Sequence, residues 1–387
     1  MRLLQLLFIA CCASSWGMSD VAGDDDDPEL ERLVAVMNKR PNRTFVTEEG
    51  DIIDCVDIHK QPALDHPLLK NHKIQMNPNL YSTKFPRDTS SNVKSVRFDS
   101  REPCPIGTVP IVRVTKENLR RARSMPKISS IQAESLHHVS TSQHLVLLID
   151  NKVANIKYGV VGCSSIFNLT VAGDQCSTHH TMIESGPPGH SSVIAAGWTG
   201  NGRDGCYNEF CRGFIQVDGK VTTKAKLIPT SVYGGPIHEV PIQIQQRLIG
   251  LFVTSFASDQ ERDSGNWWLT VADRINVGYW PKELFLNLQN GALHVAWAGD
   301  GFAGSNGVCP PMGSGYKPDG SDGDYIHSTY FRRINWVRDD GSILPPSSNT
   351  KEEVDQSNAY ALRNHRDIGG SWGYTMSFGG PGGHCWG

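Results

Sequence analysis

The chain has 387 residues, of which 39% are hydrophobic, enough to bury one large β domain and a smaller one, or two to three ordinary domains. Its formal net charge is only −3 and no basic stripe is present, so we expect no nucleic-acid partner. The sequence contains neither a Cys-x-x-Cys pair nor a His-Glu-x-x-His motif, which argues against a zinc site. We therefore predict no metal and no cofactor.

The N-terminus has the pattern of a signal peptide. A positive start, Met1-Arg2, precedes an apolar run over residues 3–13 and then small residues, a stretch too short to span a membrane. We predict a signal peptide over residues 1–23, secretion to the extracellular space or cell wall, and no membrane association after its removal. Asn42 and Asn168 each begin an Asn-x-Thr acceptor and are predicted glycosylation sites in an exported protein.

The cysteines fit an oxidising compartment. Two of the ten lie in the predicted signal peptide, and the even number that remains suits disulfides. These eight are Cys55, Cys104, Cys163, Cys176, Cys206, Cys211, Cys309 and Cys385. Spacing alone does not choose among their pairings, although Cys206 and Cys211 are close enough to close a tight loop.

The first third of the chain is of mixed character. Apolar residues at helical spacing over 29–40 predict a helix, and the polar stretch 82–102 predicts a loop. Residues 114–127 are strongly basic and lack hydrophobic alternation. They fit either a solvated helix or a linker open to proteolysis, and in the second case cleavage is expected within residues 120–141.

From residue 143 onward the pattern is almost wholly β. Apolar and polar residues alternate over 240–245 and 293–298, and Asp218-Gly219 predicts a type I′ turn in a hairpin over 213–227. Glycine is frequent, with 38 residues, as turn-rich antiparallel sheets require. The fold class predicted is mainly β, an antiparallel β-sandwich.

Residues 194–211, a short strand and a glycine-rich loop, carry the most specific pattern. The stretch reads Ile-Ala-Ala-Gly-Trp and ends in Gly-Cys-Tyr-Asn-Glu-Phe-Cys. It resembles the centre of the plant neprosin family, secreted glutamate endopeptidases that cut beside proline. Residues 51–76 and the strand-like stretch 104–111 resemble the activation peptide of the same family. Further matches in order include Tyr-Gly-Gly at 233–235, Val-Gly-Tyr-Trp-Pro at 277–281 and Phe-Gly-Gly-Pro-Gly-Gly at 378–383.

The resemblance implies a domain order. Residues 24–113 would be a small α+β pro-segment that covers the active cleft until removal, 114–142 a basic linker, and 143–387 the catalytic-type β-sandwich. It also implies disulfides between Cys55 and Cys104 and between Cys309 and Cys385, which leaves Cys163 and Cys176 for each other. The implied partners are the chain's own pro-segment and a peptide or protein substrate, with proline-rich sequences preferred.

The resemblance also locates the catalytic positions. Hydrolysis by two carboxylates needs one ionised group to activate water and one protonated group to polarise the carbonyl. The first family glutamate corresponds here to Ala195, and the second, in a Trp-Gly-Gly-Glu turn, corresponds to Asp300. Alanine can do neither task, and aspartate is one methylene shorter than glutamate. The pair is therefore degraded.

Strand alternation predicts the surroundings of these two positions. Ala195, Ala296 and Ala298 would leave an open trough that ends at Asp300. Without a charged neighbour, Asp300 is expected to ionise near the reference pKa of about 3.9 unless burial intervenes. Trp198 and Trp297 flank the catalytic positions and are predicted to wall a substrate-binding groove.

Three functions fit the sequence. The first is a neprosin-like glutamic peptidase homologue that is weak or inactive and retains peptide binding. The second is an active acid, proline-directed endopeptidase that uses Asp300 with an unidentified second acid. The third is a cell-wall carbohydrate-binding sandwich, which rests on secretion and on the groove tryptophans.

Overall fold

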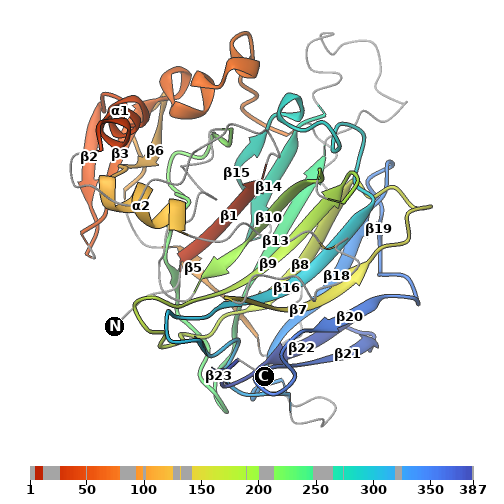
Figure 1. Cartoon of the computed structure of the whole chain (residues 1–387). Helices are drawn as coiled ribbons and strands as arrows, with labels where there is room; N and C mark the ends of the chain where they lie inside the picture. Colours follow the sequence, from red (N-terminus) through yellow and green to blue (C-terminus); the bar gives the residue numbers. More distant parts are fainter. Residues whose placement is uncertain are drawn as a thin grey trace.

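A computed structural model of the chain describes residues 5–11, 27–48, 50–78, 93–98, 102–124, 131, 142–188, 190–199, 213–246, 265–272, 274–318 and 325–385. The molecule is mainly antiparallel β, as predicted, with two large sheets packed face to face and a smaller N-terminal unit beside them (Figure 1). No helix in the described parts is long and apolar enough to cross a membrane.

The N-terminal unit combines helices with a small sheet. Helix α1 (Pro28–Met37) begins at Asp27, whose side chain accepts hydrogen bonds from the first turn, and this confirms the predicted helix. Strands β2 (Arg43–Val46), β3 (Ile52–Asp57) and β6 (Thr108–Val112) form a three-stranded sheet. Helix α2 (Lys116–Ser124) packs Leu119 into the same apolar cluster as α1, so the helix interpretation holds for this part of the basic segment.

Short elements follow β3 and carry the unit onto the sandwich. Three 3₁₀ helices, η1 (Ile58–Lys60), η2 (Pro62–Asp65) and η3 (Pro67–Leu69), run in succession. Strand β4 (Lys94–Ser95) then pairs with β13 (His238–Gln246) in parallel, and β5 (Arg97–Phe98) pairs with β12 (Leu227–Ile228).

The first large sheet has six strands. In spatial order they are β1 (Gln5–Cys11), β10 (Ser192–Thr199), β9 (Cys176–Ser185), β16 (His294–Phe302), β7 (Gln143–Asp150) and β20 (Lys351–Val354). The edge strand β1 comes from the predicted signal peptide and pairs antiparallel along β10. The central strands β9, β16 and β10 are buried throughout.

The second large sheet lies against the inner face of the first. Its main strands are β11 (Ile215–Gln216), β15 (Ile275–Trp280), β14 (Trp267–Val271), β13, β8 (Gly159–Ser165), β18 (Thr329–Val337), β22 (Tyr374–Gly379) and β21 (Ala361–Asp367). Strand β19 (Ile343–Leu344) pairs with β18 at the margin, and β17 (Val308–Cys309) pairs with β23 (Gly383–His384) separately. The short helix η5 (Lys282–Leu284) follows β15.

One large apolar core fills the space between the sheets. It includes alternate residues of the facing strands, such as Val240, Ile242 and Ile244 of β13, together with the buried tryptophans. Alternation explains this arrangement, because every second side chain of a strand faces the same side of its sheet.

The predicted hairpin over 213–227 does not form. Asp218 does make a turn, because its Oδ1 accepts hydrogen bonds from the backbone N–H groups of Lys220 and Val221. The two arms nevertheless find other partners, since β11 pairs with β15 and β12 pairs with β5 of the N-terminal unit. Each arm contains only a two-residue strand, and a turn at residues 223–224 interrupts the predicted alternation. The partner strands are distant in sequence, since β15 lies about 60 residues after β11 and β5 about 130 residues before β12.

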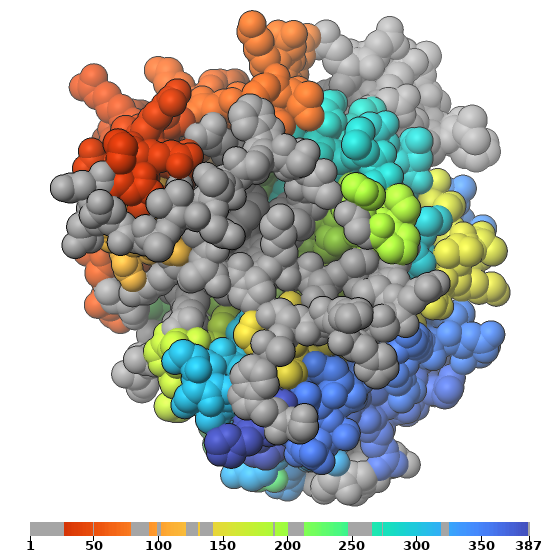
Figure 2. All heavy atoms as spheres, in the orientation of Figure 1, coloured from red at the N-terminus to blue at the C-terminus, as the bar shows by residue number. Residues whose placement is uncertain are grey.

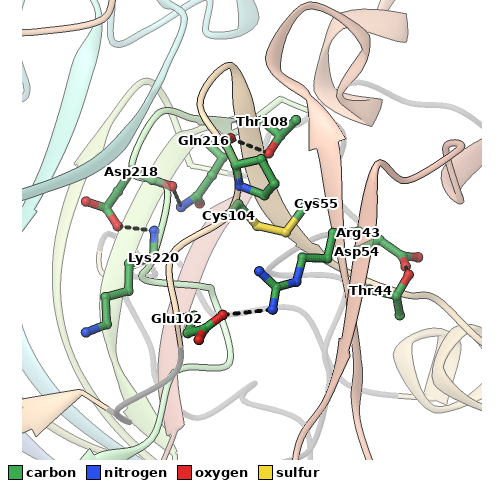
Figure 3. The surroundings of a disulfide bond; sticks show 11 residues. Arg43, Thr44, Asp54, Cys55, Glu102, Cys104, Thr108, Gln216, Asp218 and Lys220 are labelled. Atoms are coloured by element: carbon green, nitrogen blue, oxygen red, sulfur yellow. Dashed lines mark hydrogen bonds and ion pairs between the residues drawn. A yellow bond between two sulfur atoms is a disulfide. The ribbon is translucent and has the colours of Figure 1, made fainter.

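Two of the disulfides implied by the family resemblance are present. Cys55–Cys104 joins β3 to the segment before β6, next to the Arg43–Glu102 ion pair (Figure 3), and Cys309–Cys385 ties the C-terminus to β17. Cys206 and Cys211 lie outside the described residues.

The expected bond between Cys163 and Cys176 is wrong. Cys163 belongs to a small apolar cluster on the outer side of β8, together with Val161. Cys176 belongs to β9 in the other sheet. It lies on the outer side of that strand together with Thr178 and His180, because every second residue faces the same side. The two thiols therefore face away from each other across the sandwich and are not bonded to one another.

The N-terminal unit docks firmly on the sandwich. Gln61 and Gln216 exchange two hydrogen bonds, and the Tyr279 hydroxyl contacts both the His72 ring and the backbone N–H of Gln75 at 2.9 Å. Leu69 belongs to the large core. In the space-filling view the orange residues of this unit abut the turquoise residues around β15 (Figure 2).

Candidate active site

The outer face of the six-stranded sheet, called the trough face below, contains the positions singled out in the sequence. It has an apolar cluster of its own, separate from the main core. Its members are Leu145, Leu147, Ile149, Met182, Val193, Ala195, Ala296 and Ala298. The grouping of the three alanines on one face is thus as predicted. They are fully buried, however, so the expected open trough is covered in this form of the protein.

The register fixes the relation between the two catalytic positions. Ala195 lies opposite Met182 on β9, and Asp300 lies opposite Thr178 on the same strand. Four residues of β9 separate the two levels, roughly 13 Å at about 3.3 Å per residue. His180 lies midway between them on the trough face.

Asp300 is not a turn residue but lies inside β16, with only 1% of its surface exposed. Burial raises the pKa of its carboxyl to about 8, a hydrogen bond from Thr178 Oγ1 opposes this shift, and the negative charge of Asp355 adds to it. The expectation of a pKa near 3.9 is therefore wrong, because burial does intervene. At neutral pH Asp300 carries a proton that it can donate.

His180 is the residue on this face that sequence reasoning missed. Its Nδ1 lies 3.8 Å from Asp300 Oδ2, and burial lowers the pKa of the ring to about 4. Its neighbours on the adjacent strands are Gly197 and Ala298, which are both small. The alternating pattern of β9 could have placed this side chain on the trough face, but only the sheet register brings it beside Asp300.

Local sequence explains how β16 presents Asp300. Gly299 points toward the core, where an added Cβ would lie 2.6 Å from the ring of Phe378, so glycine lets the strand pack closely there. The neighbouring Ala298 and Asp300 consequently face outward.

The prediction that Trp198 and Trp297 wall a groove is wrong. Both side chains are fully buried in the core between the sheets. The indole N–H of Trp198 donates to Ser164 Oγ, and that of Trp297 donates to the backbone carbonyl of Val161, each at 3.0 Å. Since alternate residues face opposite sides, a tryptophan next to an outward residue must face inward.

The segment between the N-terminal unit and the sandwich reaches the trough face. The backbone N–H of Ile131 donates to Oε2 of the buried Glu184 at 2.7 Å, and the Ile131 side chain packs on the apolar cluster that contains Ala195. Ser142, at the end of this segment, accepts a hydrogen bond from the backbone N–H of Ala303, just beyond Asp300.

Other predicted sites are placed as follows. Asn42 and Asn168 are both exposed and outside regular strands, which leaves them accessible to glycosylation. Within the described ranges, the one grouping of potential metal ligands is His144 with Cys309 and Cys385, whose sulfurs are already joined in a disulfide.

The fold and the site together define a class of protein, a β-sandwich with an attached N-terminal unit whose connecting segment contacts the face that contains Ala195 and Asp300. Comparison with family models agrees with this description. Residues 188–381 match the Neprosin family model, and residues 44–155 match that of the Neprosin activation peptide. The chain belongs to the neprosin family.

Proposed function

We propose that this protein is a secreted neprosin-type peptidase homologue that binds peptides along the trough face and has lost hydrolysis by a glutamate pair. The observation that carries the proposal is the set of contacts that Ile131 makes with the trough face. Its backbone N–H meets Glu184 and its side chain lies on the apolar cluster, as an extended peptide substrate would. A buried carboxylate offered to a backbone N–H suits any peptide in that position.

The ends of the connecting segment support the same conclusion. Ile131 lies at the level of Glu184, and Ser142 lies beside Ala303, past the level of Cys176. Eight residues of β9 separate Cys176 from Glu184, roughly 27 Å along the sheet. The connecting segment thus contacts the trough face at Ile131 and enters the β7–β16 ladder at Ser142, which supports a zymogen-like form matured by cleavage within residues 120–141.

The chemistry at Ala195 limits catalysis. A methyl group neither activates water nor donates a proton, so the glutamate pair of the family is not available. Asp300 retains the second acid position and is kept protonated by burial. We therefore expect hydrolysis that is weak at most.

A working acid endopeptidase is the second candidate, favoured by the proton that Asp300 retains at neutral pH. The carbohydrate-binding alternative loses its main support because Trp198 and Trp297 are interior residues. Secretion to the extracellular space or cell wall, with residues 1–23 removed, is supported by the two disulfides and by the exposure of Asn42 and Asn168.

The test compares precursor and matured protein in binding a fluorescent proline-rich peptide. We expect the peptide to bind after proteolysis within residues 120–141. Ile131→Asp should allow weaker binding without proteolysis, because the charged side chain no longer packs on the apolar cluster. Tyr316→Ala, an exposed aromatic elsewhere, is the control. The double change Ala195→Glu and Asp300→Glu should add cleavage. Absence of binding in the matured, folded protein would overturn the proposal.

A further inference from the structure

The trough face contains buried polar atoms without partners. Among the described residues, no hydrogen bond reaches either ring nitrogen of His180 or Oδ1 of Asp300. The adjacent His179 faces the core and is half satisfied, because its Nε2 accepts a hydrogen bond from the backbone N–H of Gly313 while its Nδ1 has no partner among the described residues. Buried polar groups are nearly always satisfied, so unpaired ones in one spot indicate a site for reacting groups or water.

We propose that His180 and Asp300 form an acid–base pair that slowly hydrolyses a peptide bound in the trough, with His180 as the base in place of the lost glutamate. The inference rests on the proposed function, since the peptide must first reach this face. The geometry places His180 correctly for the role. It lies midway between the levels of Ala195 and Asp300 and beside the small residues Gly197 and Ala298, which leave room for water and a peptide bond.

The reaction balances without a further reactant. His180 takes a proton from water, and the water oxygen bonds to the carbonyl carbon while the Asp300 hydroxyl donates a hydrogen bond to the carbonyl oxygen. As the C–N bond breaks, Asp300 gives its proton to the leaving nitrogen. His180 then returns the proton it took to the Asp300 carboxylate, which lies 3.8 Å away. The products are one carboxylic acid and one amine.

The surroundings hold both groups in the required states. Burial keeps Asp300 protonated up to a pKa of about 8 and His180 neutral down to a pKa of about 4. Strand β10 presents Ala195, Gly197 and Thr199 here, none of which titrates in this range. Among the described residues, the other ionisable groups on or beside this face are Lys351 and Glu353 of β20, Asp355 directly after that strand, Cys176 beyond Thr178, and Glu184 and His294 at the far end.

The experiment measures cleavage of a proline-rich peptide by the matured protein under saturating conditions. His180→Gln and Asp300→Asn should each lower the rate by about 10²-fold or more, the usual contribution of general acid–base catalysis. His238→Gln is the matched control, since it is a buried histidine on β13 of the other large sheet. The unmodified protein should show a bell-shaped pH profile, because the reaction needs His180 neutral and Asp300 protonated.

The outcomes separate this inference from the proposed function. Binding without cleavage, or cleavage that survives both substitutions, overturns the acid–base pair and leaves peptide binding standing. Absence of binding overturns both. If His180→Gln fails to fold, the pH profile of the unmodified protein decides, because activity confined below pH 4 would require two carboxyls and exclude a neutral histidine base.

Discussion

The outer faces of the two large sheets both bury an acidic residue, and they surround it differently. On the second large sheet, Glu239 receives two hydrogen bonds from Arg332, at 2.6 and 2.8 Å, and a third from the Tyr330 hydroxyl. Arg332 in turn donates to the backbone carbonyl of Ser371. On the trough face, Asp300 has one hydrogen bond from Thr178 at 3.4 Å and an oxygen without a partner among the described residues.

One carboxyl is fully paired, and the other is buried with few partners. A buried acidic group that is paired with a guanidinium and hydrogen-bonded on several sides joins the strands that carry its partners. A carboxyl buried among alanines and one histidine is held neutral instead, at a cost in folding free energy that a purely structural site would not retain. The contrast supports a chemical role for the trough face.

Breaking the Glu239 network should have the largest effect on stability. Glu239→Ala leaves the Arg332 guanidinium buried without its counter-ion, and we expect a loss of about 3–5 kcal/mol in the free energy of unfolding. Urea unfolding monitored by tryptophan fluorescence measures it. Glu353→Ala removes a partly exposed ion pair with Lys351 and should cost less than about 1 kcal/mol. Equal losses for the two variants would contradict the structural role.

Substitution of Asp300 is expected to change the stability in the opposite direction at high pH. Its pKa is raised in the folded protein, so the folded state binds a proton that the unfolded state releases between about pH 4 and 8. The stability contribution of this group is therefore present below pH 4 and is lost as the pH rises to 8. Asp300→Asn should make the protein more stable at pH 8 and flatten this part of the pH dependence.

Thermal unfolding across pH 4–8 tests the Asp300 prediction. His180 contributes the reverse slope, since its lowered pKa makes the unfolded state bind more protons between about pH 4 and 6.5. In Asp300→Asn the remaining slope should come from the histidines whose pKa burial lowers, among them His180, His179 and His294, with stability falling toward acid. A variant that is strongly destabilised at pH 8 would show that Asp300 is a structural carboxylate like Glu239.

The sequence was sufficient for the features that depend on local periodicity. Alternation placed Ala195, Ala296 and Ala298 on one face, and the spacing of apolar residues located helix α1. Pairing between distant segments was beyond it, as with β12, which pairs with β5 rather than β11. Trp198 was misplaced because its nearness in sequence to Ala195 was taken as nearness in space, although strand neighbours face opposite sides.

The chemistry of Asp300 and His180 was the least predictable part of the site. The pKa of Asp300 depends on burial by strands that come from three separate stretches of sequence, so the residue type alone suggested an ordinary acid. His180 became a candidate only when the register placed it between Gly197 and Ala298. The sequence pattern predicts which face of a strand a residue occupies, whereas the strand register shows which residues lie beside it on the adjacent strands.

The smallest expected effect uses two native cysteines as reporters of the two faces. Cys163 and Cys176 are both buried, on the outer sides of different sheets. In the precursor we expect neither thiol to react with iodoacetamide while the protein is folded, and both to react after unfolding. Maturation should change the reactivity of Cys176 alone, because this residue shares the trough face with Asp300. It also pairs with Phe302, next to the residue that contacts Ser142.

Mass spectrometry of alkylated peptides, before and after proteolysis within residues 120–141, checks this prediction. Cys176 should label several-fold faster in the matured protein, since loss of the connecting segment lets reagent reach the trough face. Cys163 should label at an unchanged rate, because it lies on the outer side of β8 in the other large sheet, and it serves as the internal control. Equal acceleration at both thiols would indicate general loosening of the sandwich. A peptide in which Cys163 is joined to Cys176 would overturn the assignment of the two faces.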